Sequence, residues 1–336
     1  MLNLIIPMAG KGKRMLPHTL TTLKPMVPIA GKPIIKRLLE EIRNLYSGPI
    51  GHIGFIVKDL QPPIQSQLEE MASIIGAQPH FYEQEEALGT AHAITCANAL
   101  LQGPVLIAYP DTLFKNLFHL DTSREGIILV NQVEDPAAFG VVQVDSNNLI
   151  TDFVEKPTTF ISDLAIIGLY YFREGENLKH AIEAMINQRI CKAGEYQLTS
   201  ALTHMQQQGV KFYAQEVKEW MDCGNKQATL HTNQRFLDFL QGKEDLIAPT
   251  AQIKHSTIVP PVYLGENVII DHSVIGPYVS ISNHTHITDS HVKNSIIQEH
   301  AQINQANIQN SMIGNYAYIQ GSFQEMSVGD YNTIVL

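Results

Sequence analysis

The sequence predicts an α/β domain with a mixed, mainly parallel sheet, followed by a domain of short stacked β-strands. Up to about Leu240, short apolar runs alternate with segments of helical spacing, which is typical of a sheet covered by helices. After about Thr250 the last 87 residues contain only eight Asp, Glu, Lys or Arg, so a second helical domain with charged faces is not expected. We therefore expect one domain at residues 1–242 and another at 250–325.

Apolar runs and helical spacing place the elements of the first domain. The expected strands are Leu2–Met8, Ile53–Val57, Val105–Tyr109, Ile127–Val133 and Ala165–Phe172. The expected helices are Pro33–Tyr46, Pro63–Ile75, Thr90–Leu101 and Gln227–Leu240. The last of these helices closes the domain, and Gln241-Gly242-Lys243 is the expected exit from it.

An aliphatic repeat runs through the second domain. Aliphatic residues recur in steps of five or six, at positions 253, 258, 264, 270, 275, 281, 287, 292, 297, 303, 308, 313 and 319, and eleven of these thirteen are Ile. Each position returns three steps later, after 16 or 17 residues. Three short strands per coil give a triangular prism filled by isoleucine. An antiparallel β-sandwich is the alternative, but its strands would not keep so constant a period. The pattern resembles the left-handed parallel β-helix of hexapeptide-repeat proteins.

The composition restricts partners and location. A net charge of −10 without a long basic run argues against nucleic acid or an anionic membrane as partner. No apolar run approaches the length of a membrane span, and no signal peptide is visible. Three widely spaced cysteines without a Cys-x-x-Cys pair indicate reduced thiols. We therefore expect a cytoplasmic protein.

A glycine-containing loop with several cations follows the first strand. Its glycines are Gly10 and Gly12, and its cations are Lys11, Lys13, Arg14 and Lys24. Glycines let backbone N–H groups approach an anion, and α/β proteins bind ligands at the carboxyl edge of the sheet. A dinucleotide fingerprint is excluded because its third glycine is absent, and a P-loop because Arg14 follows Gly12-Lys13. The loop indicates a polyphosphate ligand; a basic, solvated turn is the alternative.

The spacing in this loop resembles the signature of the sugar nucleotidyltransferases, especially the glucose-1-phosphate thymidylyl- and uridylyltransferases. The chain supplies that signature at Gly10, Gly12, Arg14, Pro17, Thr19, Lys24, Pro25, Gly31, Lys32 and Pro33. It departs at Leu23, where the family usually has proline. The resemblance covers residues 2–240 and implies a Rossmann-like nucleotidyltransferase domain. Such an enzyme transfers UMP or dTMP from UTP or dTTP to a sugar 1-phosphate, glucose 1-phosphate or a related one, and releases pyrophosphate.

The resemblance also implies which residues hold the triphosphate and the metal. Arg14 and Lys24 would be catalytic cations on the triphosphate, cradled by the backbone N–H groups of Ala9, Gly10, Lys11 and Gly12. Asp111, after the strand Val105–Tyr109, and Asp222, in Trp220-Met221-Asp222-Cys223-Gly224, match the family's ligands for Mg²⁺, a hard cation that prefers carboxylate oxygen. Alone, each aspartate would be interpreted as a turn or capping residue. Pro110 replaces the glycine usual before Asp111.

Further matches place the base and the sugar. Gln84, Gly89 and Thr90 match the nucleotide-binding segment, and a glutamine side chain complements the donor and acceptor edge of uracil or thymine. The sugar-binding residues would be Gly140, Glu155, Lys156, Gly168 and Glu195, with Lys156 also a catalytic cation on the 1-phosphate. The alternatives are an exposed loop at Gln84 and a charged hairpin pair at Glu155-Lys156. The choice of sugar, and of UTP or dTTP, stays open.

The repeat raises the question of a second activity. Its histidines are His255, His272, His284, His286, His291 and His300. Some β-helix proteins are acyltransferases that use a loop histidine, but the constant steps here leave no such loop, so turn-lining histidines are expected. His284 and His286 alone are two metal ligands without a third. We expect the prism to mediate a homo-oligomer. The alternatives to the transferase are a bifunctional enzyme that also acetylates an amino sugar, and a non-catalytic nucleotide-sugar sensor.

Overall fold

The computed structural model describes residues 1–116, 118–192, 194–321 and 325–335. The chain divides into two compact units. Unit 1 consists of Met1–Gly10 and Leu38–Trp220, and unit 2 of Lys11–Arg37 and Met221–Leu336. The cation-bearing loop therefore belongs to the same unit as the C-terminal repeat. The domains expected at 1–242 and 250–325 are a different kind of division and stay a prediction; residues 322–324 of the second lie outside the described residues.

Unit 1 is built on one mixed sheet. Its strands are β1 (Leu2–Pro7), β4 (Ile50–Val57), β5 (Gln78–Glu83), β6 (Val105–Ala108), β8 (Gly126–Gln132), β9 (Gly140–Val144), β10 (Ile150–Glu155), β11 (Leu164–Phe172) and β12 (Phe212–Glu216). The order is β10-β9-β11-β6-β1-β4-β5, and β8 joins β11 to β12. Strands β5, β4, β1 and β6 run parallel, as do β8 and β12, whereas β11 is antiparallel to β6, β8 and β9. The α/β fold class with a mixed sheet is confirmed.

Helices supply the rest of the apolar core. They are α1 (Ile34–Leu45), α2 (Pro62–Ile74), α3 (Thr90–Cys96), α4 (Gly175–Asn187), α5 (Leu198–Gln207) and α6 (Lys226–Leu240). Apolar side chains of α3, α4 and α5 pack with those of β1, β6, β8 and β11 in one buried cluster. In the part of the chain that the structure describes, no helix is both long and apolar enough to cross a membrane.

The expected elements differ from the observed ones mainly at their ends. The strand expected at Ile53–Val57 begins at Ile50, and the helix expected at Thr90–Leu101 ends at Cys96. Ala97, with φ −96° and ψ 32°, leaves the helical region, and the 3-10 helix η3 (Asn98–Leu100) follows. Helices α4 and α5 and strands β5 and β12 were not expected. Both helices do have helical spacing of apolar residues, at Leu178, Ala181, Ile182 and Met185 in α4 and at Leu198, Ala201, Leu202 and Met205 in α5, so the local sequence could have predicted them. Strands β5 and β12 contain no comparable apolar run.

Short elements connect these larger ones. They are the 3-10 helices η1 (Lys13–Met15) and η2 (Lys24–Met26) and the strands β2 (Pro28–Ile29), β3 (Lys32–Pro33), β7 (Thr112–Lys115) and β13 (Glu219–Asp222). Strands β2 and β3 form a hairpin. Asn225 is the N-cap of helix α6, and its side chain accepts a hydrogen bond from the Ala228 N–H at 3.0 Å. This N-cap fixes the chain directly after the Trp-x-Asp-x-Gly segment.

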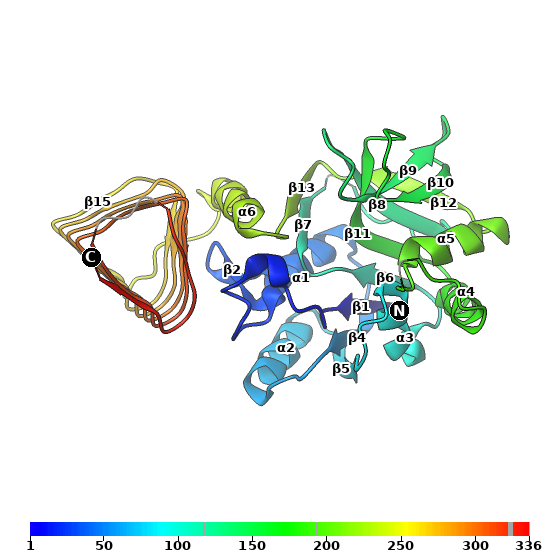
Figure 1. Cartoon of the computed structure of the whole chain (residues 1–336), viewed down its shortest axis with the longest axis horizontal. Coiled ribbons are helices and arrows are strands. Elements are labelled where there is room, and N and C mark those ends of the chain that lie inside the picture. Colours follow the sequence, from blue (N-terminus) through cyan, green and yellow to red (C-terminus); the bar gives the residue numbers. More distant parts are fainter. Residues whose placement is uncertain (117, 193, 322–324, 336) are drawn as a thin grey trace. The chain divides into compact units, whose positions relative to one another are not determined.

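The C-terminal repeat folds into a parallel β-helix, called the prism below. One face consists of β14 (Gln252–Lys254), β17 (Ile269–Asp271), β20 (His286–Thr288), β23 (Gln302–Asn304), β26 (Tyr318–Gln320) and β28 (Thr333–Val335). A second consists of β15 (Thr257–Ile258), β18 (Val274–Ile275), β21 (His291–Lys293) and β24 (Asn307–Gln309). The third consists of β16 (Val262–Leu264), β19 (Val279–Ile281), β22 (Ser295–Ile297), β25 (Met312–Ile313) and β27 (Ser327–Val328). Figure 1 shows the coils nearly end-on as a triangle.

The register of the prism follows the aliphatic columns. Leu264 lies opposite Ile281, then Ile297 and Ile313, and Val328 extends that column by one coil. Between these faces, corner residues such as His284, Asn294 and Tyr316 take left-handed φ values. Among the described residues, the strand pairings in the three faces are all parallel, so the left-handed parallel β-helix is confirmed and the antiparallel sandwich is excluded.

Candidate active site

The cation-bearing loop, residues 11–24, is built around Gly12. Gly12 has a φ of 56°, and a Cβ atom there would lie 2.9 Å from the Thr19 side chain and 3.2 Å from that of Lys24. The Thr19 hydroxyl donates a hydrogen bond to the Gly12 carbonyl at 2.9 Å. A left-handed φ and a close approach both favour glycine. Three separated positions of the motif thus pack together, with Lys24 beside the loop backbone.

The other predicted residues of this segment are more exposed. Lys11 and Arg14 are exposed, whereas Lys24, at the start of η2, is half-buried. Ala9 is half-buried, and at the exposed Gly10 a Cβ atom would meet nothing within 4 Å. Neither packing nor a positive φ therefore requires glycine at position 10, in contrast to Gly12.

The last coil of the prism contacts this loop through two side-chain interactions. The imidazole Nε2 of His18 lies 3.2 Å from the Ser327 hydroxyl, and the Thr21 hydroxyl donates to the Asp330 carboxylate. His18 is 2% exposed, and burial lowers its pKa to about 4, although the Asp330 carboxylate opposes this shift. His18 is therefore neutral at pH 7. Its Nδ1 atom has no hydrogen-bond partner among the described residues.

The third part of the motif, Gly31-Lys32-Pro33, has a structural explanation. At Gly31, with a φ of 83°, a Cβ atom would lie 2.1 Å from the ring of Tyr263 on β16. Lys32 lies 3.5 Å from the Glu244 carboxylate, and the buried Arg37 reaches the same carboxylate at 3.5 Å. The hairpin of β2 and β3 is thus packed against the entrance to the prism, within unit 2.

The predicted base-binding loop belongs to unit 1 and is closed by a distant segment. Gly89 has a φ of 112°, and a Cβ atom there would lie 2.5 Å from the Tyr196 carbonyl. The Tyr196 N–H donates to the Leu88 carbonyl at 2.8 Å, and the Ala91 N–H donates to the Tyr196 carbonyl at 2.9 Å. Thr90 adds to this connection because its hydroxyl accepts from the Leu198 N–H at 2.9 Å. Only glycine fits at position 89.

Gln84 follows β5 and is 8% exposed. Its N–H donates to the Val57 carbonyl of the neighbouring strand at 2.9 Å, and its side-chain Nε2 lies 3.4 Å from Nδ1 of His92 on α3. The alternative of an exposed loop residue is therefore wrong for Gln84. An amide has two N–H donors and an oxygen acceptor, so one donor used on His92 leaves a donor and an acceptor.

The predicted sugar-binding pair lies across two antiparallel strands. Gly140 begins β9 and pairs with Glu155 at the end of β10. A Cβ atom on Gly140 would lie 3.1 Å from Glu155 Oε2, so the glycine leaves room for the carboxylate. The Thr199 hydroxyl donates to Glu155 Oε2 at 3.2 Å. Lys156 is exposed, has a φ of 46°, and donates its N–H to the Phe139 carbonyl at 3.0 Å.

Tyr109 connects several of these residues. Burial raises the pKa of its hydroxyl, the Thr90 side chain opposes that shift in part, and the carboxylates of Asp111 and Glu155 add to it. The buried hydroxyl has no hydrogen bond of normal geometry among the described residues. Tyr109 therefore offers a neutral O–H donor close to three predicted site residues, of which Asp111 is half-buried beyond the carboxyl end of β6.

Gly168 lies in an irregularity of β11. The pairing register with β8 shifts between Ile166 and Tyr170, and Gly168 has a φ of 87°. Its carbonyl accepts from the Tyr109 N–H at 3.0 Å, and the neighbouring Ile167 carbonyl accepts from the Thr112 hydroxyl at 2.6 Å. The bulge thus positions the segment that carries Tyr109.

Asp222 and Glu195 both lie in tight turns. The Asp222 carboxylate accepts from the Gly224 N–H at 2.9 Å, and a Cβ atom on Gly224 would lie 2.7 Å from Asp222 Oδ2. The Thr232 hydroxyl of α6 holds the Asp222 carbonyl at 2.7 Å. Glu195 is exposed, and its carboxylate accepts from the Gln197 side chain at 2.8 Å.

Unit 1 therefore brings together one group of predicted residues around Tyr109. Tyr109 itself was not among the residues predicted from the sequence. The group contains Thr90, Asp111, Gly140, Glu155 and Gly168. Gln84 contacts His92 instead, and Lys11, Gly12, Arg14, Lys24 and Asp222 belong to unit 2. The only sequence signal for Tyr109 was its place at the end of an apolar strand, directly before Pro110-Asp111. No sequence signal pointed to Thr199, whose hydroxyl donates to the Glu155 carboxylate.

A comparison with known proteins identifies the family. Residues 4–238 match the family described as nucleotidyl transferase. Because that match spans more than half of the chain, this chain belongs to the nucleotidyl transferase family. A solved nucleoside-diphosphate-sugar pyrophosphorylase from Vibrio cholerae RC9 shares the fold, with a TM-score of 0.60 and 20% identity over 69% of this chain and 99% of that one.

Curated relatives differ in the nucleotide named. The chain is 28% identical over 312 residues to glucose-1-phosphate thymidylyltransferase of Streptomyces antibioticus, covering 86% of this chain and 85% of the relative. It is 30% identical over 246 residues to the bifunctional protein GlmU of Methanococcus maripaludis, covering 72% of this chain and 56% of the relative. It is 33% identical over 177 residues to mannose-1-phosphate guanylyltransferase catalytic subunit beta of Drosophila melanogaster, covering 50% of this chain and 47% of the relative.

Proposed function

We propose that this chain transfers UMP or dTMP from the nucleoside triphosphate to a sugar 1-phosphate, glucose 1-phosphate or a related one, with Mg²⁺. An oxygen of the sugar phosphate attacks the α-phosphorus, a new P–O bond forms, the bond to the β-phosphate oxygen breaks, and pyrophosphate leaves. The packing of Gly12, Thr19 and Lys24 carries the proposal. These three residues are separated in the family motif but meet in one loop, where the lysine lies beside the loop backbone.

The triphosphate binds the cation-bearing loop. Two phosphate anions must approach each other in this reaction, so cations and backbone N–H groups are needed where charge develops. Arg14 and Lys24 supply the cations, and the backbone from Ala9 to Gly12 supplies donors. The open space beside Gly10 supports this role, since packing does not explain its glycine.

Asp111 and Asp222 are proposed to hold Mg²⁺. Their carboxylate oxygens are the ligand type that Mg²⁺ takes, and Gly224 leaves room for the Asp222 carboxylate, so the donor set fits this ion. When bound, Mg²⁺ neutralises phosphate charge and orients the phosphate oxygens for an in-line displacement. Asp111 follows β6, directly before β7, and Asp222 is the last residue of β13.

Gln84 and Gly89 are proposed to read the base. The donor and the acceptor that Gln84 keeps beyond His92 match the O4 and N3–H groups of uracil or thymine. Gly89 offers a backbone N–H, and Thr90 begins α3 next to it. Guanine offers a similar pair in O6 and N1–H, but it carries an N2 amino donor where uracil and thymine have the O2 acceptor. The backbone N–H of Gly89, directed at O2, therefore favours UTP or dTTP over GTP.

The sugar is proposed to bind beside Gly140 and Glu155. Glu155 Oε2 already accepts from Thr199 and keeps a second oxygen for a sugar hydroxyl. The neutral Tyr109 hydroxyl is a further donor there. Lys156 binds the 1-phosphate as a compact, movable cation. Gly168 and Glu195 are assigned to the sugar site as well.

Pyrophosphate release tests the proposal. UTP, dTTP, CTP, ATP and GTP are each offered with several sugar 1-phosphates and Mg²⁺, to wild type, Asp111→Asn and Asp145→Asn. Asp145 is the matched control because its carboxylate only caps a hairpin turn, which asparagine can also do. We expect release with UTP or dTTP that is lost in Asp111→Asn alone. Activity with GTP alone would contradict the joint assignment of Gln84 and Gly89 to the base, and silence across the panel would contradict the reaction.

The alternatives are separated by the same protein preparation. A bifunctional enzyme would also release free thiol from acetyl-CoA in the presence of an amino sugar phosphate, and a sensor would bind nucleotide sugars without releasing pyrophosphate. The prism is proposed to join copies of the chain into a homo-oligomer, which light scattering tests: a monomer at micromolar concentration would contradict it. The cytoplasmic location stays a prediction.

A further inference from the structure

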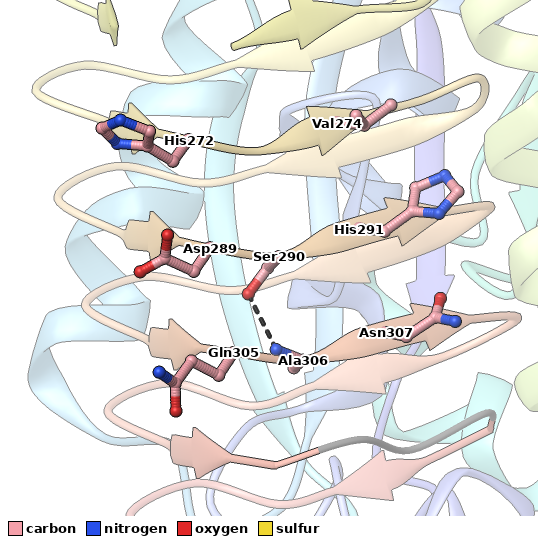
Figure 2. A pocket seen from close by; sticks show the side chains of 8 residues that line it. All are labelled: His272, Val274, Asp289, Ser290, His291, Gln305, Ala306 and Asn307. Carbon is pink, nitrogen blue, oxygen red and sulfur yellow. Dashed lines mark hydrogen bonds between the residues drawn. The ribbon is translucent and has the colours of Figure 1, made fainter. Parts of the chain in front are cut away.

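One corner of the prism carries a column of side chains of types that can bind a metal. His255, His272, Asp289 and Gln305 occupy this corner in successive coils, each with a left-handed φ between 44° and 51°. Figure 2 shows His272, Asp289 and Gln305 one above another at the ends of their strands, beside a shallow pocket. Because each coil adds one strand to the same face, residues one coil apart are about 4.8 Å apart. The fold therefore places side chains from separate coils within ligand distance.

The first two coils bring three donors to one point. Nδ1 of His255 lies 3.1 Å from Asp271 Oδ1, and Nδ1 of His272 lies 3.0 Å from the same oxygen. The donor atoms of these three residues all lie within 4.8 Å of one another. The two imidazole rings stack with centroids 4.6 Å apart and planes at 25°. Both rings thus turn the same nitrogen toward a single carboxylate.

We propose that His255, Asp271 and His272 bind a divalent first-row transition metal, with Zn²⁺ as the probe, and so clamp the first two coils together. Tetrahedral Zn²⁺ with ligands at 2.0–2.1 Å separates neighbouring ligand atoms by about 3.3–3.4 Å. The observed separations of 3.0 and 3.1 Å are close to that value, so small side-chain rotations suffice. Exposure of both imidazoles leaves the remaining position to water.

The donor set distinguishes this site from the proposed Mg²⁺ site. Two imidazole nitrogens and one carboxylate suit zinc, nickel or copper, whereas Mg²⁺ prefers oxygen ligands. Asp289, in the next coil, adds negative charge on the side of His272 (Figure 2). The earlier pair His284 and His286 is not part of any three-residue ligand group among the described residues.

A second stacked pair in the same prism provides the matched control. His284 and His300 stack with centroids 4.9 Å apart and planes at 7°, and His300 stacks in turn on Tyr316. This pair has the ring geometry of the proposed site without a carboxylate completing a ligand group. Comparison of the two pairs therefore separates metal binding by the three-residue group from weak binding by any exposed histidines.

Calorimetric titration of Zn²⁺ into the full chain tests the proposal, with Asp271→Asn, His255→Gln and His300→Gln as variants. We expect one-site binding in wild type and His300→Gln, weakened at least about tenfold in the other two, since even outer-sphere partners cost 10–100-fold. Equal affinity in all four proteins, or no one-site binding in wild type, would overturn it. Circular dichroism confirms folding. Pyrophosphate release with Mg²⁺ should be unchanged in Asp271→Asn, so this proposal and the transferase fail independently.

Discussion

The prism and the sheet of unit 1 reach their structures by different rules. In the prism, a residue meets its partner in the next coil: Thr288 bonds to Asn304, and Asn294 to Asn310, each 16 residues away. In unit 1, the contacts that build the candidate site join distant segments, as between Thr90 and Leu198, 108 residues apart. Defects in the prism should therefore act on its stability coil by coil, whereas defects in unit 1 should act on the site at once.

The largest expected effect is on stability, in the core of the prism. Ile287 is 0% exposed, and replacing it by alanine leaves a cavity that costs about 2–5 kcal/mol. Ile253, in the same column of the first coil, is 39% exposed and serves as the control. We expect Ile253→Ala to cost less than half as much in urea unfolding followed by circular dichroism. Equal costs would contradict the view that the column is a buried core.

Lys24 tests the cation-bearing loop. Lys24→Ala removes the charge held beside Gly12 and should lower kcat by about 10²–10³, or about 2.7–4 kcal/mol, with the fold intact. The exposed Lys243, also in unit 2, is the control and should retain wild-type kcat as alanine. Steady-state pyrophosphate release measures both. A Lys24→Ala variant with normal kcat would remove this lysine from the proposed mechanism.

Gly89 tests the long-range closure in unit 1. Gly89→Ala combines a positive φ with a Cβ atom 2.5 Å from the Tyr196 carbonyl. It should therefore lower the free energy of unfolding by more than the about 1 kcal/mol that a strained φ alone costs. Gly76 also has a positive φ, 75°, but open space around it. Gly76→Ala therefore isolates the strain from the collision. We expect Gly89→Ala to raise KM for the nucleoside triphosphate severalfold; identical behaviour of the two variants would be the opposing result.

His18 tests the contact between the loop and the last coil. Its folded pKa of about 4 lies below the ordinary 6.5, so the unfolded chain binds the proton first as the pH falls. The stability that neutral His18 contributes is complete above pH 6.5 and is lost toward pH 4, with about 2 kcal/mol gone between pH 7 and pH 5. His18→Gln should flatten this pH dependence, and the corner residue His300→Gln should not. Urea midpoints at the two pH values measure it.

The same contrast explains what the sequence could predict. The class and the register of the prism were predicted because each coil repeats the same local pattern. The spacing of Leu264, Ile281 and Ile297 is enough to place them in one column, and no contact between distant segments has to be known. The first strand and its loop were predicted because an apolar run and ordered glycines and cations are also local signals. Helices α4 and α5 have a local signal of the same kind, the helical spacing of their apolar residues, and were nevertheless missed.

The candidate site could be predicted only in part, for the same reason. Gly12 and Gly89 were selected by motif spacing, but the partners that require glycine, Thr19 and Tyr196, appear only in the folded chain. Tyr109 was overlooked because the burial of its hydroxyl near Asp111 and Glu155 is a property of the folded chain, not of its sequence context. Gly31 is also a motif residue, but its packing against the Tyr263 ring is enough to explain why glycine is required there.

The most direct measurement follows the phosphorus atom itself. A single turnover is run with UTP or dTTP labelled at the α-phosphate and, separately, at the γ-phosphate, with glucose 1-phosphate or whichever sugar 1-phosphate the panel identifies, and Mg²⁺. The proposed reaction places the α-label in the nucleotide sugar and the γ-label in pyrophosphate, and Lys24→Ala slows both by the same factor. An α-label in free UMP or dTMP, or a γ-label in orthophosphate, would mean hydrolysis and would contradict nucleotidyl transfer by this chain.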